Sequence, residues 1–237
     1  MYCISGIEQL DRVPELAELT DDEFCLSFDF SPDFIAAVCS HGYYPMAVLT
    51  EEAPVLLIKL HRERCVLDFG QLSPPVAVRR RGRGLAVSVD RDFAGCLAGI
   101  ARQHPDNWLI PPLAAAFTRM HREGEWRTRL HSIELWEGDT LLAGEVGFAV
   151  GGCYSSLSGF HARSGAGKVQ LYAAARLLAE CGFAFWDLGM EMEYKRELGA
   201  HLLPRAVFLE RFRAAATLPV RLVCPLREAG PLLIPQD

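Results

Sequence analysis

Apolar residues recur at helical spacing in the first half of the chain, and short apolar runs lie between these stretches. The first helix is predicted to begin at Ser31, a favoured N-cap, with Pro32 at the first helical position, and to end at Gly42. The predicted helices of this half span residues 31–42, 91–103 and 111–120, the predicted strands span 54–60, 65–69 and 85–89, and a turn is predicted at 43–46.

In the second half of the chain, apolar and polar residues first alternate, as in β-strands, and the apolar residues then return to helical spacing. Apolar and polar residues alternate over 127–136 and 140–150, on either side of a Glu-Gly-Asp turn, and this pattern predicts a hairpin. A Gly- and Ser-rich stretch at 151–167 is interpreted as a loop, and residues 168–181 as a long helix that stops at Gly182. Residues 183–187 then form a short buried strand. Because two strands joined through a helix run parallel, this order predicts an α+β fold with one parallel strand pair.

Composition places the chain among soluble globular proteins. It has 237 residues, half of them hydrophobic, which is enough for one large domain or two small ones. No apolar run approaches the roughly 18–20 residues that span a bilayer, and residues 1–15 lack the features of a signal peptide. We therefore expect a cytoplasmic protein with no membrane partner. The eight cysteines include no C-x-x-C pair, so we expect buried, reduced thiols and no metal site.

Charge is unevenly distributed. The formal net charge is −6, which argues against nucleic-acid binding by bulk charge. The window from Lys59 to Arg83 is nevertheless basic, and it ends in the run Arg79, Arg80, Arg81 and Arg83. Guanidinium groups pair bidentately with phosphates, so this run is a candidate phosphate-binding site. The alternative is a solvated loop, which is the usual fate of a short charge run.

Asp187 is the first candidate for catalysis. It stands at the end of the predicted buried strand, where a carboxylate can have a raised pKa and accept a proton. The alternative is a carboxylate that caps the turn after the strand. Trp108 offers an aromatic face for stacking, with a core position as its alternative.

Residues 163–168 form a Gly-rich turn that leads into the long helix. A Walker A loop would need Gly at position 162 and Ser or Thr at position 169, where Ala162 and Val169 stand. The acyl-CoA loop of acetyltransferases would need Gln or Arg at position 162. Two interpretations of this segment remain. It is either a turn whose backbone N–H groups bind an anion or a flexible loop that only precedes a helix.

Short segments of distinctive composition follow one another from residue 42 to residue 208. They are Gly42-Tyr43-Tyr44-Pro45-Met46, Val87 to Phe93, Asn107-Trp108-Leu109-Ile110-Pro111, His131 to Trp136, Leu142 to Gly147, Gly151-Gly152, Lys168, Asp187, Leu198-Gly199-Ala200, Pro204-Arg205 and Phe208. In this order and spacing, the set resembles the bacterial leucyl/phenylalanyl-tRNA–protein transferases. The resemblance covers residues 28–212.

The resemblance implies a fold and a reaction. It implies a GNAT-type acyltransferase domain over residues 85–237, preceded by a small α/β N-terminal lobe over residues 1–84. The reaction would move an amino acid from aminoacyl-tRNA to the N-terminal α-amine of an acceptor protein, which marks that protein for N-end rule degradation. No cofactor is implied, and a monomer is expected. The alternative is a GNAT-like protein that uses another acyl donor or has become a non-catalytic binding module.

The resemblance also implies site residues. Asp187 matches the family's catalytic Asp, and it would accept or relay the proton of the amine or orient that amine. The implied substrate-binding residues are Trp108, Ser158, Phe160, Glu145 and Glu134, and the implied tRNA-binding residues are Arg79, Arg80, Arg81, Arg83 and Lys168.

The chain departs from the family pattern at three places, one of which is a tryptophan pair whose positions fall near Ile58 and Lys59. The Gln that follows the catalytic Asp is replaced by Gly189, and the Glu of the Gly-Glu-Ser segment is replaced by Leu157. We therefore expect altered donor or acceptor specificity, with Glu145, Glu191 or Glu193 as substitutes for the missing carboxylate.

Overall fold

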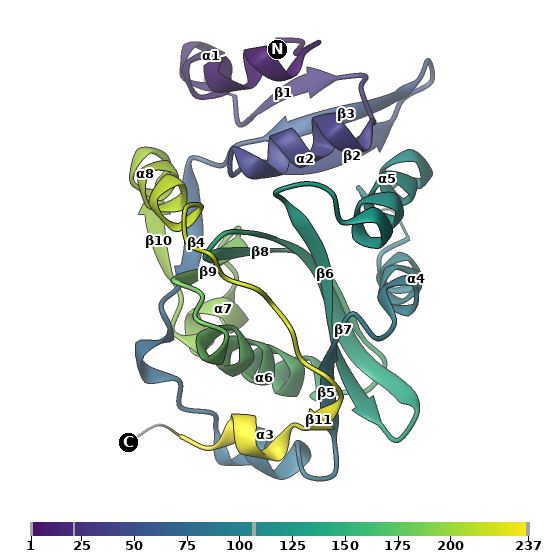
Figure 1. Cartoon of the computed structure of the whole chain (residues 1–237), viewed down its shortest axis with the longest axis vertical. Helices are drawn as coiled ribbons and strands as arrows, with labels where there is room; N and C mark the ends of the chain where they lie inside the picture. The colour runs from purple at the N-terminus through teal and green to yellow at the C-terminus, as the bar shows by residue number, and fades with distance from the viewer. Residues whose placement is uncertain (1, 21, 106–107, 236–237) are drawn as a thin grey trace.

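The computed structural model describes residues 2–20, 22–105 and 108–235, and it contains two β-sheets flanked by helices (Figure 1). Asn107 of the motif before Trp108 lies outside the described residues. The smaller sheet has the strand order β1-β3-β2, and the larger has the order β10-β4-β9-β8-β7-β6-β5-β11. The predicted mixed α+β class is therefore confirmed.

The smaller sheet is formed near the N-terminus. Its strands are β1 (Phe24–Ser27), β2 (Tyr44–Leu49) and β3 (Pro54–Lys59), all antiparallel, and beside it lie η1 (Ile7–Arg12), α1 (Val13–Thr20) and α2 (Pro32–Ser40). The Ser31 hydroxyl accepts the Phe34 N–H, as the predicted N-cap requires. The predicted turn at 43–46 is wrong, because β2 begins at Tyr44. Pro45 is tolerated there because β2 is an edge strand of its sheet.

The larger sheet supplies the framework of the site. Its strands are β4 (Glu63–Leu67), β5 (Ala86–Val89), β6 (Arg129–Glu137), β7 (Thr140–Val150), β8 (Cys153–His161), β9 (Phe185–Gly189), β10 (His201–Pro204) and β11 (Arg227–Glu228). The β6–β7 hairpin confirms one prediction. A parallel pair before and after the long helix is also present, but its first strand is β8, which the sequence did not predict. The predicted loop at 151–167 is wrong, because β8 fills most of it. Small Gly and Ser residues weaken the strand signal, yet β8 is held between β7 and β9.

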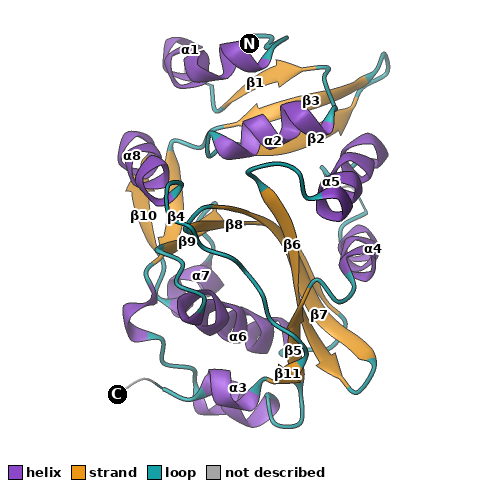
Figure 2. Ribbon diagram, in the orientation of Figure 1, coloured by secondary structure: helices purple, strands orange, loops and turns teal. Residues whose placement is uncertain are grey.

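Helices cover both faces of the larger sheet, as the ribbon coloured by secondary structure also shows (Figure 2). The helix α6 (Ala166–Glu180) connects β8 to β9 and ends before Gly182, whose φ of 84° confirms the predicted stop. On the other side of β6 and β7 lie α4 (Phe93–Gln103) and α5 (Pro111–Glu123) (Figure 1). The remaining elements are α3 (Val76–Arg81), α7 (Glu193–Leu198), α8 (Arg205–Ala215) and η3 (Gly230–Leu233). The arginine run therefore lies mainly on a short helix, rather than on a loop.

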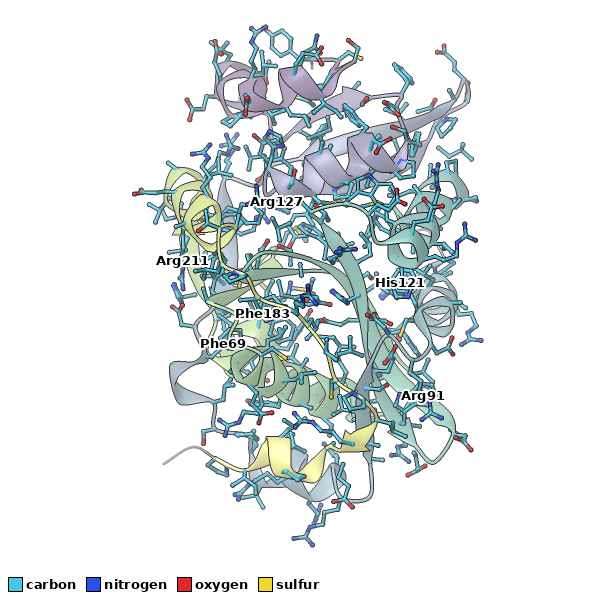
Figure 3. The ribbon with its side chains drawn as sticks, viewed as in Figure 1. Phe69, Arg91, His121, Arg127, Phe183 and Arg211 are labelled. Carbon is cyan, nitrogen blue, oxygen red and sulfur yellow. The ribbon has the colours of Figure 1, made fainter. Side chains whose placement is uncertain are left out.

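The two sheets share one hydrophobic core. Buried Phe34 of α2, Phe117 of α5 and Phe212 of α8 belong to the same cluster. Polar contacts also cross between the sheets: Trp126 Nε1 donates to Asp33 Oδ1 and Thr128 Oγ1 donates to Ala36 O, both at α2. Arg127, labelled in Figure 3, donates to Ala216 O at the end of α8. The strand β4, although it lies before residue 84, pairs with β9 and β10 of the larger sheet. No helix in the described part of the chain combines the length and apolar character needed to cross a membrane.

Candidate active site

A cavity of about 780 Å³ opens where two parallel strands diverge. The parallel ladder of β8 and β9 ends at the pair Ser155–Asp187, whereas β8 continues to pair with β7 up to His161. The residues that follow this pair on both strands line the cavity. The lining includes Tyr44, His61, Trp108, Glu145, Ser156, Leu157, Ser158, Phe160, Lys168, Leu171, Leu188, Gly189, Met190, Tyr194 and Lys195. The divergence itself therefore creates the cavity.

Three buried polar atoms without a hydrogen-bond partner among the described residues belong to side chains of this lining. They are Tyr44 Oη, His61 Nδ1 and Glu145 Oε1. Leaving a buried polar group unpaired is costly, so most such groups in native proteins have a partner. Tyr44 and Glu145 also interact with the side chains of Asp187 and Tyr154, and the three groups together make this cavity a candidate site for a polar ligand.

Glu145, on β7, is the carboxylate of this cavity. Its Oε2 accepts a hydrogen bond of 2.9 Å from Ser156 Oγ, which in turn accepts one of 2.8 Å from Trp186 Nε1. Because an indole N–H can only donate, the direction of this chain is fixed and the Ser156 proton points at the carboxylate. Burial raises the Glu145 pKa to about 7, against the opposing effects of Ser156, Tyr154 and Lys195. The carboxyl can therefore gain or lose a proton near neutral pH.

Asp187 does not line the cavity, and its side chain is fully buried. Its Oδ2 accepts from Arg64 Nη1 at 2.6 Å and from Ser155 Oγ at 2.8 Å, and its Oδ1 accepts from Gly189 N at 3.0 Å. It thus both forms a buried ion pair and caps the turn at the end of β9, which was the alternative that the sequence left open.

Arg64, on β4, is the partner that holds Asp187. Its side chain is fully buried, and its guanidinium lies 4.4 Å from the Tyr44 ring centroid and 4.2 Å from that of Phe208. A second donor, Nη2, binds Gly42 O at 2.8 Å. Arg64 on β4 therefore contacts β9, α8 and the segment before β2, beside the cavity.

Positive charge lies on the cavity wall and at its rim. The Lys195 ammonium is buried and donates to Leu188 O and Met190 O, and burial lowers its pKa. His61 has its pKa lowered to about 3, mainly by burial and then by the charge of Arg64, so its imidazole is neutral. At the rim, Lys168 in the first turn of α6 is exposed and paired with Glu197 at 2.5 Å.

The arginine run of α3 lies next to the start of α6. A Cβ placed on Gly165 would lie 2.9 Å from Arg81 Nη1, so the Arg81 guanidinium lies against the turn that leads into this helix. Gly167 and Lys168 of the same segment line the cavity. The predicted anion-binding turn and the predicted phosphate-binding run are therefore neighbours, although they are far apart in the sequence.

The predicted site residues divide into two groups. Trp108, Ser158, Phe160, Glu145 and Lys168 line the cavity, whereas Asp187, Glu134 and the arginines at 79, 80, 81 and 83 do not. Glu134 is fully buried in β6 and accepts hydrogen bonds from Ser88 Oγ, Ser132 Oγ and Asp92 N.

Tyr44, His61 and Lys195 line the cavity but were not predicted as site residues, although Tyr44 belongs to a family-like segment. They come from β2, the segment before β4, and α7. No motif of a metal or nucleophile site surrounds them in the sequence, and only the folded chain brings them to one cavity.

Comparisons with known proteins identify the chain's relatives. The family described as leucyl/phenylalanyl-tRNA protein transferase matches residues 66–213. A leucyl/phenylalanyl-tRNA–protein transferase of Ruegeria pomeroyi is 31% identical over 185 residues, which cover 78% of this chain and 86% of the relative. The protein of that name from Nitratidesulfovibrio vulgaris is 34% identical over 180 residues, covering 73% and 72%. The one from Roseobacter denitrificans is 29% identical over 209 residues, covering 87% and 94%.

Solved structures show weaker similarity. The C-terminal domain of a lysylphosphatidylglycerol synthetase from Agrobacterium fabrum gives a TM-score of 0.46 at 12% identity, covering 90% of this chain and 78% of that one. FemX gives the same TM-score and identity, covering 86% and 78%.

Proposed function

This chain belongs to the leucyl/phenylalanyl-tRNA protein transferase family, and we propose that it transfers an amino acid from aminoacyl-tRNA to the N-terminal α-amine of an acceptor protein. The observation that carries the proposal is the cavity with three unpartnered polar atoms next to exposed cations. As in the family, the transferred residue would mark the acceptor for N-end rule degradation.

The cavity provides what this reaction needs. An aminoacyl ester is already activated, so the protein must bring the two substrates together, remove a proton from the amine and stabilise the developing oxyanion. Trp108, half-buried beside Phe117, presents a ring on which the terminal adenine stacks. Lys168 and the first turn of α6 receive the phosphates of the acceptor end, and the α3 arginines extend this surface.

The cavity also bears on one departure from the family pattern, the Leu at position 157. Leu157 replaces the family's Glu, but Glu145 lies on the neighbouring strand β7 and lines the same cavity. Glu191 and Glu193, the other two candidates, do not line it. Of the three candidates, Glu145 is therefore the one that can supply a carboxylate inside the cavity.

We further infer a GNAT-type arrangement for the larger sheet and the monomeric, cytoplasmic state expected for the family. The arrangement is supported by the parallel β8–β9 pair, which α6 connects and which diverges at the cavity. Asp187 serves this arrangement as a positioning residue, because it fixes Gly189 and the end of β9 at the cavity wall.

A transfer assay tests the function. Purified protein is incubated with individually charged, radiolabelled aminoacyl-tRNAs and with peptides that differ at residue 1. We expect label in peptides with a free α-amine and none in acetylated controls. Ser158→Trp, which fills the cavity, should abolish transfer, whereas Val207→Trp on the exposed surface of α8 should not. Absence of transfer from every charged tRNA, together with transfer from acyl-CoA, would replace this proposal with the alternative acyl donor.

A further inference from the structure

We propose that Glu145, and not Asp187, is the catalytic residue that accepts the proton of the acceptor α-amine. This inference rests on the proposed function, and it assigns the base of that reaction within this chain. The two carboxylates differ in position: Glu145 lines the cavity, whereas Asp187 is buried behind its wall in an ion pair with Arg64.

Of these two carboxylates, Glu145 is the one that belongs to the cavity lining and has an oxygen without a hydrogen bond of normal geometry. Its side chain lines the cavity, Oε2 is held by Ser156, and Oε1 is buried without a hydrogen-bond partner. Asp187 has both oxygens engaged and no place in the lining. The Tyr154 hydroxyl is the side-chain donor next to this carboxyl, besides Ser156, and an ammonium group that enters the cavity would supply a charged donor to it.

The surroundings of Glu145 suit a group that gains and loses a proton. Its pKa of about 7 lies close to the reference value near 8 of an α-amine, so proton transfer between them is nearly balanced. Burial and then the charge of Glu145 raise the pKa of Tyr154 on β8, and burial and then the charge of Glu134 raise that of Cys96 on α4, so both are neutral. Tyr194 is also neutral, with its pKa raised by burial and Glu145. The Lys195 charge favours the carboxylate.

The proposed proton transfer and peptide-bond formation conserve protons and bonds. The acceptor α-ammonium gives one proton to the Glu145 carboxylate. The neutral nitrogen then attacks the ester carbonyl carbon, which forms the C–N bond and breaks the bond to the terminal ribose oxygen. The leaving oxygen receives the second proton of the attacking nitrogen. Protonated Glu145 afterwards releases its proton to water, and no oxidant, reductant or metal takes part.

The deciding measurement is the pH dependence of single-turnover transfer with the full chain, saturating aminoacyl-tRNA and a free-amine peptide. In the wild type we expect the rate to fall below a pH near 7. Glu145→Gln keeps the side-chain size but cannot accept a proton, so we expect a rate about 10²–10⁴-fold lower, with an acidic limb that now follows the pKa of about 8 of the amine itself. The KM for aminoacyl-tRNA should stay unchanged.

Three further variants separate a catalytic role from a structural one. Ser156→Ala removes a hydrogen bond that favours the carboxylate, so it should move the limb to higher pH. Glu134→Gln, which alters a buried carboxylate outside the cavity, should leave the limb in place. Asp187→Asn should also keep the limb, even if it lowers the rate.

Folding of the key variant is checked by its thermal midpoint. Burial raises the Glu145 pKa, so the folded form binds this proton more tightly and stability falls as pH rises from about 4.5 to 7. Glu145→Gln should therefore melt at or above the wild-type temperature at pH 8. If the wild type transfers amino acids and Glu145→Gln matches its rate at every pH, the assignment of Glu145 is wrong and the proposed function stands. If the wild type transfers nothing, the proposed function itself fails.

Discussion

At the scale of single residues, the Arg64–Asp187 pair determines how the cavity wall is held. Both side chains are fully buried, and their ion pair of 2.6 Å joins neighbouring strands β4 and β9. Burying two charges costs hydration free energy, which is offset here by the pairing, by Ser155 and Gly189 N, and by the rings around Arg64. Removing either partner leaves an unpaired charge in the interior.

This predicts that Asp187→Ala lowers the free energy of unfolding by about 3–5 kcal/mol, because Arg64 is left buried and unpaired. The double variant Arg64→Met with Asp187→Leu should recover most of this loss, since apolar side chains of similar size carry no unpaired charge. Urea denaturation followed by circular dichroism measures both. Equal losses in the single and double variants would show that the charge pairing is unimportant.

At the scale of secondary-structure elements, the meeting of α3 with the start of α6 creates the basic rim. The last turn of α3 carries Arg79, Arg80 and Arg81, all exposed, and Arg81 lies against Gly165 just before α6. The overall charge of −6 gives no hint of this surface, because acidic residues elsewhere outweigh it. The local distribution of charge is therefore what matters for tRNA binding.

We expect replacement of these three arginines by Gln to raise the KM for aminoacyl-tRNA by about tenfold and to flatten its salt dependence. Each lost phosphate contact reduces the slope of log K against log salt by about 0.7–0.9. The measurement is KM at several salt concentrations. The matched control replaces Arg12, Arg119 and Arg122, which are exposed on η1 and α5. The same change in both triple variants would point to bulk charge instead of a defined rim.

At the scale of the whole molecule, the shared core makes the two sheets one folding unit. Phe34 of α2 packs in the same cluster as Phe117 and Phe212, and Arg205 on α8 donates to Leu60 O and His61 O in the connection between the sheets. Tyr44 and His61 reach the cavity from the N-terminal part of the chain. The cavity is therefore complete only when both sheets are packed together.

Phe34→Ala tests this coupling, because it should destabilise the protein by about 3–5 kcal/mol through the cavity it creates. All four tryptophans lie between residues 108 and 186, outside the smaller sheet. If the core is shared, Phe34→Ala lowers the urea midpoint by the same amount whether unfolding is monitored by tryptophan fluorescence or by circular dichroism. Leu178→Ala in α6 serves as a control that should shift both signals as well. A fluorescence midpoint that does not move in Phe34→Ala would show that the smaller sheet unfolds independently.

Local chemistry was enough to predict the strongly patterned elements. The start of α2 follows from Ser31 and Pro32, the end of α6 follows from Gly182, and the hairpin of β6 and β7 follows from alternation around its turn. Their signals lie within a few residues of the feature they predict, so no tertiary contact is needed. β2 and β8 were missed because proline, glycine and serine are weak strand formers that long-range pairing overrides.

The sequence by itself determined the family, the mixed α+β class and a set of candidate residues, because these depend on residue identity and spacing. Only the tertiary structure decided which candidates share a cavity. It buried Asp187 against Arg64, placed Glu145 on the cavity wall and brought Tyr44, His61 and Lys195 beside it. The physical reason is that burial, an unpaired carboxylate oxygen and a pKa near 7 are properties of the packed surroundings, and those surroundings come from segments distant in the sequence.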